Sequence, residues 1–149
     1  MARRARAVSN VVATMILIMV AVAGGLIAWM FMTQFSKPRT VASLSIASAT
    51  ATIPPDGSIA AVNIMVRNDG NVPLNITTVS FEYAGKTYNE TLNRLLSAGA
   101  ATTLGFKLKP SDFNVAAFTE GKEIQITIYY KDPQGNVYQK TAFATIRIG

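Results

Sequence analysis

The chain contains neither histidine nor cysteine. Without histidine, Ser-His-Asp catalysis, histidine metal sites and a histidine pH switch are excluded. Without cysteine, thiol catalysis, cysteine-ligated zinc, haem thioether links and disulfides are excluded as well. A secreted fold held together by disulfides is therefore ruled out, and a folded domain must rest on its own apolar core.

Charged residues are also scarce, and they are unevenly placed. They make up 15% of the 149 residues, whereas about 25% is usual in globular chains. No ionisable side chain lies between Ala7 and Lys37, and the first acidic residue is Asp56. Three arginines in the first six residues contribute to the net charge of +6, while residues 37–149 hold 11 basic and 8 acidic residues without a basic stripe. A nucleic-acid partner is therefore not expected.

The charge-free segment is strongly apolar. From Val11 to Met32 the only polar side chain is Thr14, and these 22 residues compare with the roughly 20 that cross a hydrocarbon core as a helix. A helix over Val8–Phe35 would be about 42 Å long. Because it is apolar on every side, it must be buried in lipid or in other protein. We expect the helix to be buried in a membrane, against other copies of the chain, or in one after the other. The arginine-rich tip is expected in the cytoplasm.

Three interpretations of this segment compete. It suits a plain single-span anchor, and it also suits a secretory signal peptide with Ala21-Val22-Ala23 as the cleavage site. Cleavage after Ala23 would leave an apolar tail that begins at Gly24 and has no evident place to pack, which argues against the signal peptide. The third interpretation rests on a family resemblance.

The segment RRARA-VSNVVATMILIMVAVAGGLIAWMF resembles the N-terminus of archaeal type IV pilins and archaellins. The resemblance implies that a leader peptidase removes residues 1–7, because Arg6-Ala7 matches the basic and small residues before the cut and Val8 would be the first mature residue. It implies that the helix over residues 8–36 anchors the subunit in the cytoplasmic membrane. An assembly ATPase and a platform protein would then transfer the helix into the core of a helical filament of identical subunits.

The polymerising surface implied by the resemblance is the apolar helix itself. The candidate residues are Val11, Val12, Met15, Ile16, Ile18, Met19, Val22, Leu26 and Trp29. One of them departs from a related pattern, because many bacterial relatives carry a glutamate where Val12 stands. Pairing of that glutamate with a neighbour's amino group is therefore absent, and apolar packing must set the axial register.

Two glycines, Gly24 and Gly25, lie in the middle of the expected helix. Each costs about 1 kcal/mol relative to alanine in a helix interior. Small residues allow helices to pack closely, and a pair of glycines can also mark a flexible point at which a helix bends. Both readings suit a helix that moves between a membrane and a filament.

Residues 37–149 show the alternation of an all-β domain, after a connector in which Pro38 disfavours further helix. Seven strands separated by turn signals predict an immunoglobulin-like sandwich, so the fold class is α+β. The expected strands are Val41–Ile53, Ser58–Arg67, Leu74–Tyr83, Lys86–Asn89, Ala100–Leu108, Lys122–Lys131 and Val137–Ile148.

Two loops carry more specific expectations. Asn68-Asp69-Gly70-Asn71 is a turn of residues that tolerate positive φ. Within Pro110–Gly121, Ser111 is a candidate cap for one helical turn through Val115–Phe118.

No catalytic, metal or cofactor motif is found. Asp69 lies in a loop without the spaced carboxylates and bidentate glutamate of a calcium site, and no phosphate loop, nucleophile elbow or zinc motif occurs. We therefore expect no enzymatic activity, no metal and no cofactor. Asn75 and Asn89 begin two N-glycosylation acceptor sequences, so a glycan is a candidate modification.

The sequence thus predicts a pilin, a structural subunit of an extracellular archaeal pilus-like filament for adhesion. An archaellin of a motility filament shares every feature used. A membrane-anchored extracellular binding domain that never polymerises is the other alternative, and leader cleavage and filament formation would separate it from a pilin.

Overall fold

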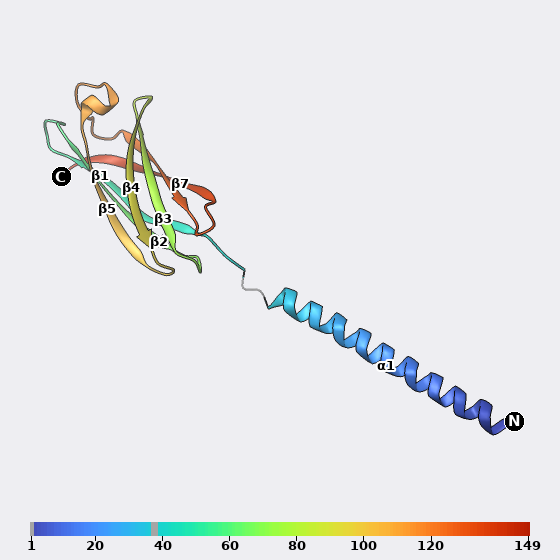
Figure 1. The fold of residues 1–149 in the computed structure, drawn as a ribbon. Coiled ribbons are helices and arrows are strands. Elements are labelled where there is room, and N and C mark those ends of the chain that lie inside the picture. Colours follow the sequence, from blue (N-terminus) through green and yellow to red (C-terminus); the bar gives the residue numbers. More distant parts are fainter. Residues whose placement is uncertain (1, 37–38) are drawn as a thin grey trace. The chain divides into compact units, whose positions relative to one another are not determined.

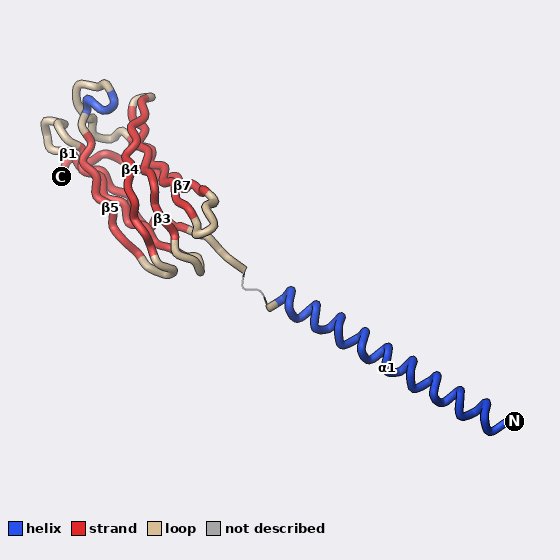
Figure 2. The backbone as a smooth tube through the Cα atoms, in the orientation of Figure 1, coloured by secondary structure: helices blue, strands red, loops and turns tan. Residues whose placement is uncertain are grey.

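The computed structural model describes residues 2–36 and 39–149, and side chains from Ala7 onward within those ranges. The chain forms two compact units, Met1–Arg39 and Thr40–Gly149, which Figures 1 and 2 show as a helix and a β domain. Pro38, to which the sequence assigned the end of the helix, lies outside the described residues. We call the second unit the head.

The first unit contains one helix, α1 (Ala2–Phe35), as expected, although it begins earlier than Val8. The earlier start follows from alanine and arginine, which favour helix. The helix runs unbroken through Gly24 and Gly25, where an added Cβ would meet nothing within 4 Å. Neither glycine is therefore required by packing inside the subunit.

The head contains seven strands in one mixed sheet, which confirms the α+β class. Their order in the sheet is β4-β3-β6-β7-β1-β2-β5. Among the described strands, every pairing is antiparallel except that of β1 with β7, which is parallel and joins Ala51–Ile53 to Ile146–Ile148. The strands are β1 (Leu44–Ile53), β2 (Ala60–Asn68), β3 (Leu74–Tyr83), β4 (Lys86–Leu96), β5 (Ala101–Leu108), β6 (Glu123–Lys131) and β7 (Val137–Ile148).

Two sequence expectations need correction. β4 continues to Leu96 rather than ending at Asn89. Two residues of β4, 92 and 93, stand opposite Thr77 of β3 in a bulge, and the pairing resumes with Arg94 opposite Ile76. The helical turn expected through Val115–Phe118 is absent there; instead a 3-10 helix, η1, spans Pro110–Phe113.

The position of η1 has a local cause. The Asp112 carboxylate accepts a hydrogen bond from the Lys109 backbone N–H at 3.0 Å. Asn114 then ends the helix with a left-handed backbone, φ 54°. Ser111 lies inside this helix and is not its cap.

The head builds its core from its own strands. All buried apolar residues lie between Leu44 and Ile146, so among the described residues α1 contributes none. Phe81 on β3 packs edge-on against Phe106 on β5 with ring centroids 5.1 Å apart. Because these strands lie far apart in the sheet order, the sheet must curl over this core. Each buried side chain of this size contributes about 1.5–3 kcal/mol.

One buried polar residue, Asn68, joins the loops at one end of the head. Its amide donates to the carbonyls of Val72 at 2.8 Å and Leu96 at 3.0 Å, while its side-chain oxygen accepts from the Gly70 N–H at 3.0 Å. The residues of this turn tolerate positive φ, but none of them adopts it. Gly70 is required for a different reason, since an added Cβ would lie 2.1 Å from the Val41 carbonyl oxygen.

Replacing Asn68 by alanine should lower the free energy of unfolding by about 1–3 kcal/mol, because buried carbonyls lose their donor. Urea unfolding of the full chain in detergent, followed by near-UV circular dichroism, measures this change. Asn93→Ala, at an exposed position of β4, is the matched control and should change the unfolding free energy by less than about 0.5 kcal/mol. Equal stability of the two variants would contradict the role assigned to Asn68.

Candidate functional site: the exposed apolar helix

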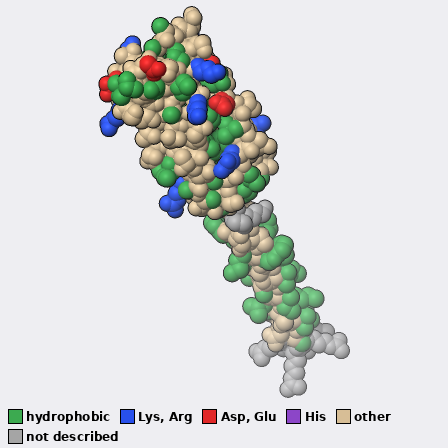
Figure 3. Space-filling model, turned by 90° about the vertical axis from the view of Figure 1, so that its left-hand side faces the viewer, with side chains coloured by type: hydrophobic (Ala, Val, Ile, Leu, Met, Phe, Trp, Pro, Cys, Tyr) green, Lys and Arg blue, Asp and Glu red, His purple; other side chains and the backbone are tan. Residues whose placement is uncertain are grey.

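The apolar side chains of α1 are exposed around the whole helix. Val12 is the most covered large one, at 48% exposure, and Phe35 the least, at 82%. The nine candidate polymerisation residues from Val11 to Trp29 all belong to this set. Figure 3 shows apolar side chains over the visible face of the helix, in contrast to the mixed surface of the head. The structure thus places these residues on one element without burying any of them.

The length of this apolar surface exceeds what a bilayer requires. Ala7–Phe35 has 29 residues and is long and apolar enough to cross a membrane. At about 1.5 Å per residue it spans about 43 Å, against a hydrocarbon thickness of about 30 Å. A membrane anchor and an uncleaved signal sequence both meet this description.

Three hydroxyl groups, two in α1 and one just after it, donate to backbone carbonyls of the helix. The hydroxyl of Thr14 donates to the Asn10 carbonyl at 2.8 Å, that of Thr33 to Met30 at 2.9 Å, and that of Ser36 to Met32 at 2.5 Å. Such bonds to carbonyls one turn earlier remove the need for outside partners. The helix can therefore enter an apolar environment without leaving these hydroxyls unpaired.

The expected cleavage site lies on the first turns of this helix. Ala7 and Val8 are helical, and the Val8 side chain is exposed. The side chain of Arg6 lies outside the described part. No contact among the described residues covers the bond between Ala7 and Val8.

Several aspartates of the head are bonded within its turns. No group of three or more metal-binding side chains is found among the described residues. Asp69 lies 3.1 Å from the Arg67 guanidinium in an exposed ion pair. The Asp132 carboxylate accepts hydrogen bonds from the backbone N–H groups of Gln134 and Asn136, from the Asn136 amide and from the Tyr138 hydroxyl.

These hydrogen bonds change the titration of the turn carboxylates. Desolvation raises the pKa of Asp132, but the hydrogen bonds from Asn136, Gln134 and Tyr138 outweigh it, so this pKa lies below its ordinary value. A hydrogen bond from Ser58 lowers the pKa of Asp56 in the same way. Desolvation and the nearby Asp132 charge raise the pKa of Tyr138.

The two glycosylation candidates differ in exposure. Asn89 is exposed on β4, whereas Asn75 on β3 is partly buried. The side-chain oxygen of Asn75 is buried and has no hydrogen-bond partner among the described residues. Of the two acceptor asparagines, Asn89 is the more exposed to solvent.

No family model matches the chain, and no curated protein matches it. Among solved structures it is similar to the ApaA protein from Bordetella pertussis, at 12% identity over 73% of this chain and 98% of that chain, with a TM-score of 0.48. Red sea bream transglutaminase matches at 17% identity over 71% of this chain and 16% of its own, with a TM-score of 0.48. The copper-bound PCuAC domain from PmoF2 matches at 14% identity over 75% of this chain and 100% of its own, with a TM-score of 0.47. None of these similarities assigns the chain to a family or a function.

The lowered pKa of Asp132 gives a pH-dependent contribution to stability. Because the pKa is lower in the folded state, the contribution is present above the unfolded pKa of about 3.9 and is lost as the pH falls through the folded value. Asp132→Asn should therefore lower the melting temperature at pH 7, and the difference from the parent chain should shrink towards pH 2. Thermal unfolding between these pH values tests this, with Glu120→Gln as the control. A difference that does not vary with pH would exclude the mechanism.

Proposed function

We propose that the chain is a structural subunit of an extracellular, type IV pilus-like filament that serves in adhesion and is not an enzyme. In this proposal residues 1–7 are a leader removed before Val8, α1 polymerises the subunits, and the head is an immunoglobulin-like sandwich displayed outside the cell. The observation that carries the proposal is the 29-residue apolar segment Ala7–Phe35 of α1, none of which is buried in the subunit.

The free-energy cost of exposing the apolar side chains of α1 to water supports a helix that passes from one apolar environment to another. Burying one large aliphatic side chain contributes about 1.5–3 kcal/mol, and α1 carries many such side chains. Lipid before assembly, and neighbouring helices after it, both keep them out of water. The net hydrophobic gain of exchanging lipid for protein is small, so dispersion and close fit between helices must hold the filament.

The independence of the head supports the same proposal. Because its core consists entirely of residues of the head, the helix can leave the membrane while the head remains folded. Gly24 and Gly25 leave open space beside the helix backbone, where a neighbouring helix can approach closely.

A charge within α1 should prevent assembly. Ile18→Asp places a carboxylate among the apolar side chains, and we expect filaments to be absent from electron micrographs of cell-surface material. Ile18→Leu, which conserves volume and polarity, is the matched control and should form filaments. The near-UV circular dichroism of the head should be the same in both variants. Normal filaments from Ile18→Asp would refute helix-core polymerisation.

Leader removal gives a second test. N-terminal sequencing with intact mass of sheared cell-surface material should show a chain that begins at Val8. A chain that begins at Gly24 would instead establish a conventional signal peptide. Retention of Met1 or Ala2 in a protein confined to membranes would establish a simple anchor, and the filament proposal would then fall.

A further inference from the structure

Two adjacent rows of solvent-facing side chains on four neighbouring strands are polar and carry no charge. The pairing of β4, β3, β6 and β7 places residues directly opposite one another across the sheet. One row consists of Thr91, Thr78, Tyr129 and Gln139, and the next consists of Asn89, Ser80, Thr127 and Thr141. We call these eight residues the polar grid. Neighbouring strands lie about 4.8 Å apart, and residues two apart on one strand about 6.7 Å apart.

Every position of the polar grid carries a hydroxyl or an amide group. Such groups both donate and accept hydrogen bonds. Among the described residues, the one hydrogen bond between two grid side chains joins the hydroxyls of Thr127 and Thr141 at 3.4 Å. Most of this hydrogen-bonding capacity therefore faces solvent and is free to meet a ligand.

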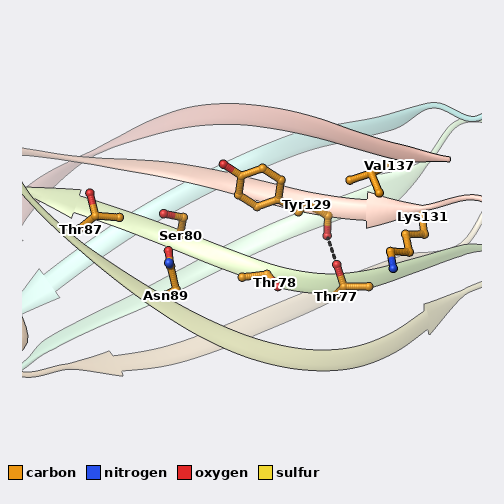
Figure 4. A pocket seen from close by; sticks show the side chains of 8 residues that line it. All are labelled: Thr77, Thr78, Ser80, Thr87, Asn89, Tyr129, Lys131 and Val137. Carbon is orange, nitrogen blue, oxygen red and sulfur yellow. Dashed lines mark hydrogen bonds between the residues drawn. The ribbon is translucent and has the colours of Figure 1, made fainter. Parts of the chain in front are cut away.

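A hollow of about 590 Å³ lies over one side of the polar grid. Figure 4 shows its lining, in which Thr78 and Ser80 from β3, Asn89 from β4 and Tyr129 from β6 surround a common space. Thr77, at the bulge of β3, donates to the Tyr129 carbonyl at 3.3 Å and ties the two strands together beside it. The volume is in the range of small-ligand sites, and the partly buried Tyr129 ring gives it a flat apolar surface.

We propose that the polar grid and this hollow bind a neutral polysaccharide. A sugar chain presents many hydroxyl groups that donate and accept, together with apolar C–H faces that pack against an aromatic ring. The grid offers the complementary groups without a charged side chain. The assignment deepens the adhesive function proposed above and rests on it only for the position of the head outside the cell.

Other occupants fit the polar grid less well. Nucleic acids and acidic polysaccharides require clustered cations, whereas the lining of the hollow contains a single cation, Lys131. The centre of an interface between protein copies is usually rich in aromatic and apolar residues. Here Ser80 and Thr127 occupy the centre, and the exposed Phe143 lies outside the two rows.

The test measures binding of the full chain in detergent micelles to immobilised mannan and hydroxyethylcellulose, with heparin as the acidic probe. The grid variant is Thr78→Val with Asn89→Ala. The matched control is Thr103→Val with Asn63→Ala, which makes the same changes at exposed positions of β5 and β2. We expect the parent chain to bind at least one neutral polysaccharide. The affinity should fall at least tenfold in the grid variant and stay unchanged in the control.

Three results would overturn the assignment. They are no binding of either neutral polysaccharide, equal or stronger binding of heparin, and equal loss of affinity in the grid and control variants. Circular dichroism of both variants verifies that they are folded. Because the assay uses chains in detergent, it does not depend on filaments, so failure of binding and failure of polymerisation are measured separately.

Discussion

The constraint on which the rest of the molecule depends is an apolar helix that its own chain cannot cover. All large apolar side chains of α1 from Val8 to Phe35 are about half exposed or more. A surface of this extent is stable only in lipid or against other proteins. The hydroxyls of Thr14 and Thr33 bond to the helix's own carbonyls, so these two groups stay paired in either environment. The head must therefore be a unit that folds without the helix.

The head meets this requirement through a single apolar core and one polar junction. The junction connects the start of the head to the loop that follows β2. The Val41 N–H donates to the Asn71 side chain at 2.7 Å, and the Val41 carbonyl accepts from the Asn71 N–H at 3.1 Å. Asn68, in the same loop, binds the end of β4. The first residues of the head are thus bonded to loops at its own end, which fixes where the head begins regardless of what surrounds α1.

The sequence predicted those elements whose signal is local. The long apolar run predicted α1, and alternation with turn residues predicted seven strands, two of them, β3 and β7, with the bounds that the structure shows. The second half of β4 was missed because its apolar alternation is interrupted: Glu90 and Arg94 stand where apolar residues would continue the pattern. The helical turn was predicted at the wrong residues. Its position depends on the hydrogen bond from the Lys109 N–H to the Asp112 carboxylate, which is one of several local caps that this segment could form. The rows of the polar grid were not predictable, because register between strands is a property of pairing.

The low charge of the head surface is consistent with the separate roles of the helix, which polymerises in the proposed filament, and of the head, which is displayed. On the strands of the head, threonine, serine, asparagine and glutamine outnumber lysine, arginine and glutamate. In a filament of identical subunits, any excess charge of one sign repeats on every head, and heads packed within the screening length of about 8–10 Å would repel one another. Low charge limits this repulsion, while hydroxyl and amide groups keep the surface hydrated. The sparsely charged surface therefore suits both close packing of the heads and recognition of an uncharged ligand, since neither requires many fixed charges.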